Sequence, residues 1–247
     1  MKKLLIITGV VAALAVIAFF ALEFFLGSVV TAGVNKYAPQ VTQTTVTLAS
    51  ARISPLNGHG TLTQLVVGNP KGWSENNLCS LGKVHLSVAP FSIFGDHIVI
   101  NEIDIDAPEF NYETKIIASN IKDFANNIET VMGGGQAAPV KTVGGKPIKF
   151  EVKKFRLQNA KVRVGVAGSA MLLSMPALEI TDLGTKEGGI TADQLVVALM
   201  NKITPEVIAT TVKAAGNIGA TGGASAAEGV KNVGKAIQGL FGGEKKP

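Results

Sequence analysis

The sequence has one cysteine, Cys79, among its 247 residues. No disulfide can form within the chain, so packing alone must hold the fold together. A lone thiol neither requires nor excludes an oxidising compartment. No lipobox-like cysteine directly follows the N-terminal hydrophobic run, which argues against the lipid attachment that anchors bacterial lipoproteins.

Residue types that carry catalysis or bind metals are also scarce. There are three histidines, His59, His85 and His97, and none has a second ligand at a spacing typical of metal sites. The sequence contains no Gly-x-Ser-x-Gly elbow, no Walker loop and no dinucleotide fingerprint. We therefore expect no enzymatic activity, no metal site and no cofactor.

Three carboxylates, Asp104, Asp106 and Glu109, lie within six residues and resemble a cation site or an acid pair. On a strand, Asp104 and Asp106 share one face, and the neighbouring isoleucines lie on the other. This arrangement favours the solvated side of an amphipathic strand over a catalytic pair.

Charged residues make up only 17% of the chain, and aromatic residues only 6%. Lys2 and Lys3 supply two of the five units of net positive charge, so the rest is nearly balanced and no nucleic-acid partner is expected. Residues 96–129 are mainly acidic and residues 141–163 mainly basic. If strands from these segments are neighbours, opposite charges face each other across the sheet; otherwise both are ordinary solvated faces.

The most prominent feature that is present is a long apolar run at the N-terminus. Leu4–Leu22 is interrupted only by Thr8 and Gly9, and its 19 residues span about 28 Å as a helix. This length, and the bulky residues at its end, favour an uncleaved anchor over residues 1–30 rather than a signal peptide. The lysines before the run predict a cytoplasmic N-terminus and an extracytoplasmic body.

Strand-like alternation dominates residues 40–185 and begins at Val41. Two segments repeat at a constant offset of 52: Ile98, Ile100, Ile103, Ile105, Phe110 and Tyr112 match Phe150, Val152, Phe155, Leu157, Val162 and Val164. Both slip phase at the same place, Asn101-Glu102 and Lys153-Lys154, which predicts a β-bulge in each strand. Val46, Leu48, Ala51 and Ile53 fit the first four positions at the same offset. We predict an internal β repeat; the alternative is coincidence among amphipathic strands.

A helix is predicted between the two copies. Residues 121–131 have helical spacing, with Ser119 or Asn120 as the N-cap and Gly133 as the end. Such a helix would close one end of the sheet. A glycine-rich linker is expected near residues 133–147.

The C-terminal part, residues 190–247, is predicted to be a helical tail rich in glycine and alanine. A capping box at Thr191-x-x-Gln194 precedes the first helix, and Thr204-Pro205 starts a second one.

These patterns predict a mainly β fold with helices, of the α+β class. It has an N-terminal transmembrane helix, a bent antiparallel sheet or groove made from a repeated bulged-strand unit, and C-terminal helices. An uncovered apolar face on such a sheet would be a lipid-binding trough. Its candidate lining is Val84, Leu86, Val88, Ile98, Ile100, Ile103, Ile105, Phe110, Phe150, Val152, Phe155 and Leu157. The alternative is that these residues form an ordinary closed core.

Several segments resemble the N-terminal region of AsmA-type bacterial envelope proteins. They are Arg52-Ile53-Ser54-Pro55 with Gly58–Leu62, Val66–Trp73, and Val88–Glu113 with its core Ile98–Ile103, and they follow an N-terminal anchor. The resemblance covers roughly residues 1–185, and the chain is shorter than the large members. It implies a protein fixed in the inner membrane, with its β-rich part in the periplasm and a role in outer-membrane biogenesis. In long members the apolar lining of a β-groove shelters lipid acyl chains.

The function expected from the sequence is therefore non-catalytic binding or passage of acyl chains, with membrane lipid as the partner and an envelope protein as a further candidate partner. The alternative is a structural or adaptor module with a closed core that docks an envelope protein. A desiccation-type β-sandwich, suggested by the strands around Asn69-Pro70, is a third interpretation.

Overall fold

The structure, a computed structural model, describes residues 2–54, 56–115, 118–133, 147–166 and 169–221. Its helices are α1 (Lys2–Thr42), the 3-10 turn η1 (Pro90–Phe94), α2 (Asn120–Gly133) and α3 (Ala192–Thr221). Its strands are β1 (Val46–Ile53), β2 (His59–Gly68), β3 (Asn77–Val88), β4 (Ile98–Asp106), β5 (Glu109–Tyr112), β6 (Lys149–Gln158), β7 (Lys161–Val166), β8 (Ser169–Ser174), β9 (Leu178–Leu183) and β10 (Ile190–Thr191). The predicted α+β class is confirmed.

The described strands form one mixed sheet rather than the two stacked sheets of a sandwich. β1, β2 and β3 are antiparallel neighbours, β3 pairs with β4 through one half and with β5 through the other, and β6 pairs with β9 and β10. β4 and β6 are parallel, as are β5 and β7. The prediction of an antiparallel sheet is therefore wrong at these two pairs. Parallel strands need a long crossover, and α2 lies within it.

The predicted repeat corresponds to this parallel pairing. Ile98 lies opposite Phe150, Ile105 opposite Leu157, and the same offset of 52 continues through β5 and β7. The two copies therefore lie side by side, in register, and their matching apolar residues share one face of the sheet. β1, which matches part of the repeat at the same offset, is separated from β4 by β2 and β3.

One of the two predicted bulges is present in the structure. Asn101 is an extra residue between the β3–β4 pairs Ser87–Glu102 and Val88–Ile100, which confirms the bulge in β4. The bulge predicted in β6 is wrong, because β6 keeps one register with β4 and with β9 on both sides of Lys153-Lys154. Bulges of this kind bend a strand and increase its twist.

Both copies of the repeat also have a backbone kink directly after β4 and after β6. Ala107 and Asn159, again 52 residues apart, have positive φ angles of 50° and 52°. Two backbone hydrogen bonds close the kink, from Ala107 N to Gln158 O and from Lys161 N to Pro108 O, each 2.9 Å long. Because both strands turn at the same level, the sheet bends as a unit.

Opposite charges meet across the parallel pairs, as the sequence suggested for neighbouring strands. Arg156 contacts Glu102 at 3.0 Å and Asp104 at 3.2 Å, and Arg163 contacts Glu109 at 3.7 Å. These side chains are about one quarter to one half exposed, so we expect the ion pairs to contribute more to register than to stability.

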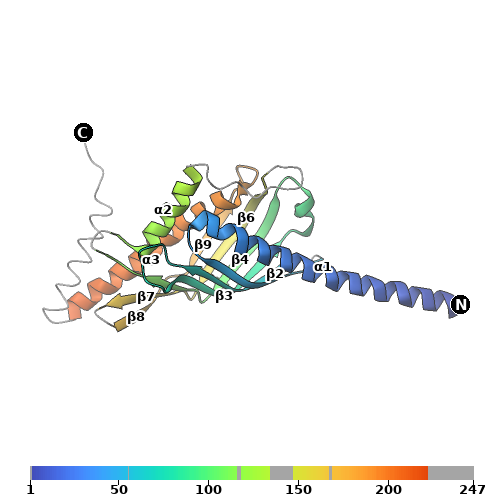
Figure 1. The fold of residues 1–247 in the computed structure, drawn as a ribbon, viewed down its shortest axis with the longest axis horizontal. Coiled ribbons are helices and arrows are strands. Elements are labelled where there is room, and N and C mark those ends of the chain that lie inside the picture. The colour runs from blue at the N-terminus through green and yellow to red at the C-terminus, as the bar shows by residue number, and fades with distance from the viewer. Residues whose placement is uncertain (1, 55, 116–117, 134–146, 167–168, 222–247) are drawn as a thin grey trace.

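Helix α1 continues without a break through residue 30 to Thr42, so the prediction of a strand beginning at Val41 is wrong. Val41 and Thr42 at the end of the helix are β-branched, and such residues favour strands although they also occur in helices. The sequence alone therefore did not locate the end of α1. The second half of α1 runs antiparallel to β1. Asn35 bonds both backbone groups of Leu48, and Gly27 packs directly on the carbonyl of Ala51. Figure 1 shows the N-terminal part of α1 leaving the body as a rod.

Helix α3 is continuous and contains Pro205, so the predicted restart at Thr204-Pro205 is wrong. The capping prediction is confirmed in part, because Gln194 Oε1 accepts the Thr191 N–H at 3.0 Å. Among the described residues, the stretch that is long and apolar enough to cross a membrane is Ala192–Ala214, 28% of which is buried. By length and hydropathy, the described residues therefore do not support the expected N-terminal anchor. The expected linker at 134–146 and the tail beyond 221 lie outside the described residues.

Candidate functional site: an apolar cavity beside the sheet

The twelve residues predicted to line a trough contribute to a single apolar cluster. Seven are buried: Val84, Ile100, Ile105, Phe110, Val152, Phe155 and Leu157. Five are half-buried and pack against them: Leu86, Val88, Ile98, Ile103 and Phe150. The sequence therefore identified one face of the sheet, and the structure divides that face into a closed part and a more open part.

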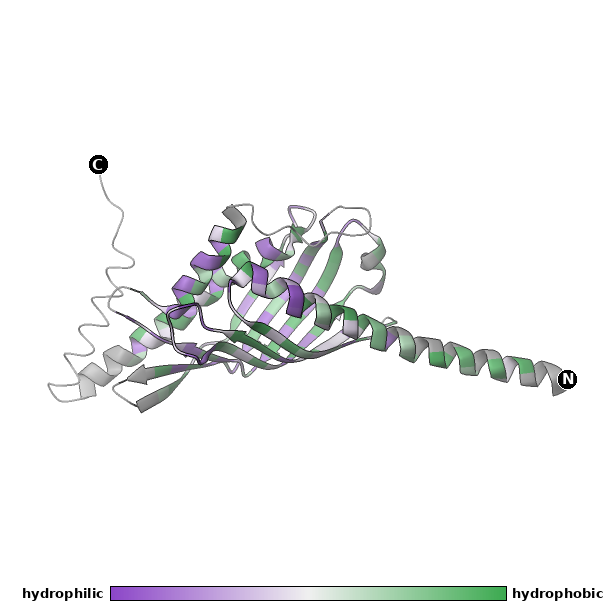
Figure 2. Cartoon of the chain, viewed as in Figure 1, coloured by the Kyte–Doolittle hydropathy of each residue, from purple (hydrophilic) through white to green (hydrophobic). Residues whose placement is uncertain are grey.

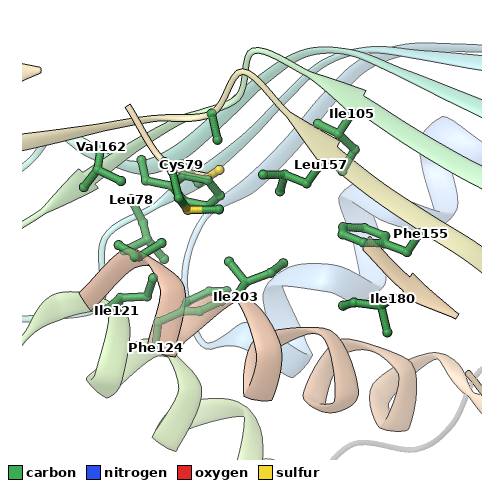
Figure 3. Close-up of a cluster of buried hydrophobic side chains, with 14 of the residues drawn as sticks. Leu78, Cys79, Ile105, Ile121, Phe124, Phe155, Leu157, Val162, Ile180 and Ile203 are labelled. Carbon is green, nitrogen blue, oxygen red and sulfur yellow. The ribbon is translucent and has the colours of Figure 1, made fainter. Parts of the chain in front are cut away.

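The closed part lies under α2 and α3. Ile121, Phe124 and Ile128 of α2 join the buried cluster, and so do Ile203 and Val207 of α3. Figure 3 shows Phe124 and Ile203 pointing from the helices toward the sheet side chains. The prediction that the helix of residues 121–131 closes one end of the sheet is confirmed. At this end the candidate lining is an ordinary core.

The more open part lies at the other end, where β3 finishes and β4 and β6 begin. Val88 pairs with Ile100, and Ile98 pairs with Phe150. Here α1 approaches from one side and the start of α3 from the other. A cavity of about 640 Å³ remains between them, lined by Val30, Gly33, Val34, Tyr37, Phe150 and Val196 among others.

The cavity wall is almost wholly hydrocarbon. α1 supplies valines and Ala38, β6 supplies Phe150 with the preceding Ile148, and α3 supplies Ala192 and Val196. Its charged lining residues are Lys36 and Asp193. Lys36 is exposed, and its Nζ lies 5.3 Å from the centroid of the Tyr37 ring, which orients the ammonium by a cation–π contact. The site therefore suits an apolar chain with its polar end at the mouth.

A second hollow, of about 790 Å³, lies on the β1 side of the same helix. It is lined by Phe20, Glu23 and Phe24 of α1 and by Ala51 and Arg52 of β1, among others. Ser28, Thr31, Asn35 and Ser50 also line it, so its wall is more polar than that of the first. Helix α1 thus stands between two hollows, and only the one facing α3 has a continuous apolar wall.

The polar contacts at the far end of the sheet have a structural explanation. Asn120 is fully buried and bonds the backbone N–H groups of Glu113 and Ile121, the carbonyl of Asn111 and the side chain of Asn69. Ser119 caps α2 by accepting the Lys122 N–H, which resolves the two N-cap alternatives. The resulting network ties the turn after β2 to β5 and α2.

Trp73 in that turn donates to Asp123 Oδ2 at 2.8 Å, and Lys115 lies over its ring at 4.6 Å from the centroid. Glu113 accepts from Ser74 and from Asn69. Every one of these groups is occupied by another protein group, so the network fastens a loop rather than binding a ligand.

The acidic cluster is also accounted for. Asp104 accepts from Arg156 and Gln158, Asp106 accepts from Asn159, and the neighbouring Glu109 faces a basic side chain. Burial raises the pKa of Asp104, but the hydrogen bonds from Gln158 and Arg156 outweigh it and the pKa is lowered. This is the solvated, paired strand face that the sequence favoured.

Two further reactive side chains in the described part of the chain are paired or buried. His97 Nε2 lies 3.0 Å from Glu151 Oε2, and that pair joins the starts of β4 and β6. The Cys79 thiol is buried in the core, and burial raises its pKa to about 12. Within the described part of the chain, no group of three or more metal-binding side chains comes together.

Sequence reasoning missed the α1 and α3 walls of the cavity. Residues 29–42 lie at and beyond the end of the predicted anchor, and 192–197 begin a predicted tail, so neither suggested a site. The available signal was the helical spacing of Val30, Val34, Tyr37 and Val41.

No protein-family model matches this chain, and no curated protein matches it significantly.

Proposed function

We propose that the protein is a non-catalytic, membrane-anchored protein of the bacterial envelope that binds lipid acyl chains. The observation that carries this proposal is the apolar cavity of about 640 Å³ between α1, the sheet and α3. Its volume lies within the range of small-molecule sites. A polar metabolite needs converging hydrogen-bond partners, and the wall offers aliphatic side chains instead.

The first two dozen residues are proposed as the membrane anchor. Helix α1 exposes large apolar side chains along its projecting part, including Ile7, Leu14 and Ile17, and Figure 2 colours the described ones as hydrophobic. The competing apolar stretch, in α3, packs Ile203, Val207 and its neighbours against the core. A helix that already covers a core is a weaker candidate for crossing a bilayer.

The orientation and compartment are part of the same proposal. Lys2 and Lys3 favour a cytoplasmic N-terminus, which puts the body in the periplasm as a single-pass protein of the inner membrane. Assignment to the AsmA type, and to outer-membrane biogenesis, rests on the resemblance of residues 1–185 alone. Protease added to intact spheroplasts is expected to digest the body; a protected body would contradict this topology.

The test of lipid binding is a size series at Gly33. A side chain there enters open space, because an added Cβ meets no heavy atom within 4 Å. The full-length chain and its Gly33→Ala, Gly33→Leu and Gly33→Trp variants are extracted in detergent, and phospholipid per protein is measured by mass spectrometry. We expect bound phospholipid to decrease as the side chain grows, with about a tenfold loss for Trp.

Gly9 provides the matched control. It lies on the same helix, also has no heavy atom within 4 Å of an added Cβ, and is remote from the cavity. Gly9→Trp should leave the phospholipid content unchanged. A wild-type protein that is free of lipid, or equal lipid loss in both Trp variants, would refute acyl-chain binding. The adaptor alternative would then be preferred.

A further inference from the structure

Three of the most exposed large apolar side chains belong to two neighbouring loops. Leu56, in the turn between β1 and β2, is 77% exposed, and Phe91 and Phe94 of η1 are 84% and 83% exposed. The two loops touch, because Val88 N donates to Gly58 O at 2.9 Å and Gly58 leaves no room for a Cβ beside the Val88 carbonyl. We name these three side chains the apolar rim.

The turn that carries Phe91 and Phe94 is held in place by the hydroxyl of Ser92. Ser92 donates to the Ala89 carbonyl at 2.6 Å, and its hydroxyl accepts the Val99 N–H at 3.0 Å. Phe91 and Phe94 are three residues apart in a 3-10 turn, and this spacing places them on one side. Two large apolar groups are therefore presented to solvent by a fixed turn, which is unusual for a surface without a partner.

The rim lies at the end of the body from which α1 projects. β1 runs antiparallel to α1, with Leu48 beside Asn35 and Ala51 beside Gly27. The turn after β1 therefore continues toward Phe20, which lines a hollow together with Arg52. Figure 1 shows the short turn between β3 and β4 at this same end.

The length of the projecting helix agrees with a bilayer at that level. From Lys2 to Phe20 there are 18 helical steps, which cover about 27 Å, close to the roughly 30 Å hydrocarbon thickness. A bilayer crossed by this segment would have its outer surface near Phe20, where the rim is.

The geometry points to the apolar rim as a second membrane contact: Leu56, Phe91 and Phe94 insert into the interface of the bilayer that the helix crosses. This inference rests on the proposed anchor. Apolar side chains at a membrane interface reach roughly 5–10 Å into the boundary between headgroups and acyl chains. Two contacts fix the body against rotation about the helix. The half-buried residues Val88, Ile98 and Phe150, whose strands end or begin here, are then held toward the lipid.

Tryptophan fluorescence in proteoliposomes tests the inference with the full-length chain. The only native tryptophan, Trp73, lies at the opposite end of β3, whose 12 residues span about 40 Å. Phe91→Trp and Phe94→Trp add a second emitter at the rim. Leu172→Trp in β8 adds one at the far end, where the side chain is 46% exposed.

Each protein is reconstituted in phosphatidylethanolamine and phosphatidylglycerol vesicles with or without brominated acyl chains. We expect the added emission of Phe91→Trp and Phe94→Trp to be quenched about twofold. Wild type and Leu172→Trp should be unaffected. Quenching at the rim no greater than for Leu172→Trp would overturn the inference.

An alkaline carbonate wash of the same vesicles separates this result from the fate of the anchor. A chain removed by the wash contradicts the proposed anchor and the rim with it. A chain that resists the wash but has an unquenched rim contradicts the rim alone.

Discussion

The amide of Asn120 is fully buried and fully hydrogen-bonded, so the stability of the fold should depend strongly on it. Its side chain makes four hydrogen bonds of 2.7–3.0 Å: Oδ1 accepts from two backbone N–H groups, and Nδ2 donates to the Asn111 carbonyl and to Asn69. All donor and acceptor positions of the amide are thus used. Replacement by alanine keeps the helix but leaves the partners unpaired.

The expected cost follows from the number of orphaned groups. Each buried group that loses its partner costs about 1–3 kcal/mol; the Ile121 N–H is buried, and the other three partners are partly buried. We expect Asn120→Ala to lower the free energy of unfolding by about 3–5 kcal/mol. For a chain of this size, that corresponds to a fall of about 6–20 °C in Tm. Asn120→Asp should cost at least as much, because the carboxylate lacks both donors.

Far-UV circular dichroism of the full-length chain in detergent, during denaturation by guanidinium chloride, measures the change. Asn126→Ala on the exposed face of α2 is the matched control and should be neutral or slightly stabilising. A loss below about 1 kcal/mol for Asn120→Ala would refute the reasoning, because the network would then be replaceable by water.

Three further predictions concern packing, charge and the thiol. Gly27→Ala should destabilise the protein by about 1–3 kcal/mol, because its Cβ would lie 2.2 Å from the carbonyl oxygen of Ala51 in β1. Gly33→Ala should stabilise it by up to about 1 kcal/mol, because alanine favours the helix and the added Cβ meets no atom within 4 Å. Thermal unfolding of the two variants measures the difference. Arg156→Met should raise the lowered pKa of Asp104, followed by NMR titration. Because the pKa of Asp104 is lower in the folded protein than in the unfolded chain, where it is near 4, this carboxylate stabilises the fold above pH 4. The stabilisation is lost as the pH falls through the folded pKa. Urea unfolding at a series of pH values should therefore show a smaller loss of unfolding free energy at acid pH for the variant than for wild type. Cys79 should resist maleimide at pH 8 until the protein unfolds, measured by mass spectrometry.

The sequence determines the faces of the strands well, because burial depends on local spacing. The offset of 52 and the slip at Asn101 are visible without a structure; the first is found in the pairing of β4 with β6 and the second in the pairing of β3 with β4. Strand direction was not predictable in the same way. A period of two shows which side chains share a face, but it carries no information on which neighbour supplies the hydrogen bonds.

The cavity was hardly predictable for a related reason. Of the twelve predicted lining residues, Phe150 alone lines it, and its α1 wall lies at and beyond the end of the predicted anchor, where a site was not expected from the sequence. Pro205 likewise suggested a helix boundary, yet Ile203 and Val207 hold both halves of α3 on one core. Tertiary packing overrode the local signal in both cases.

A single unbroken helix links the proposed anchor to the cavity, and this constrains how any lipid would enter. Val29, the first α1 residue of the cavity wall, lies nine residues after Phe20, or about 14 Å along the axis. With no hinge between them in α1, the height of the cavity above the membrane is set by the helix itself. An acyl chain reaching the cavity from the proposed bilayer would therefore travel along α1. Its apolar route would be the exposed side chains of that helix and the half-buried start of β6, which line the cavity together.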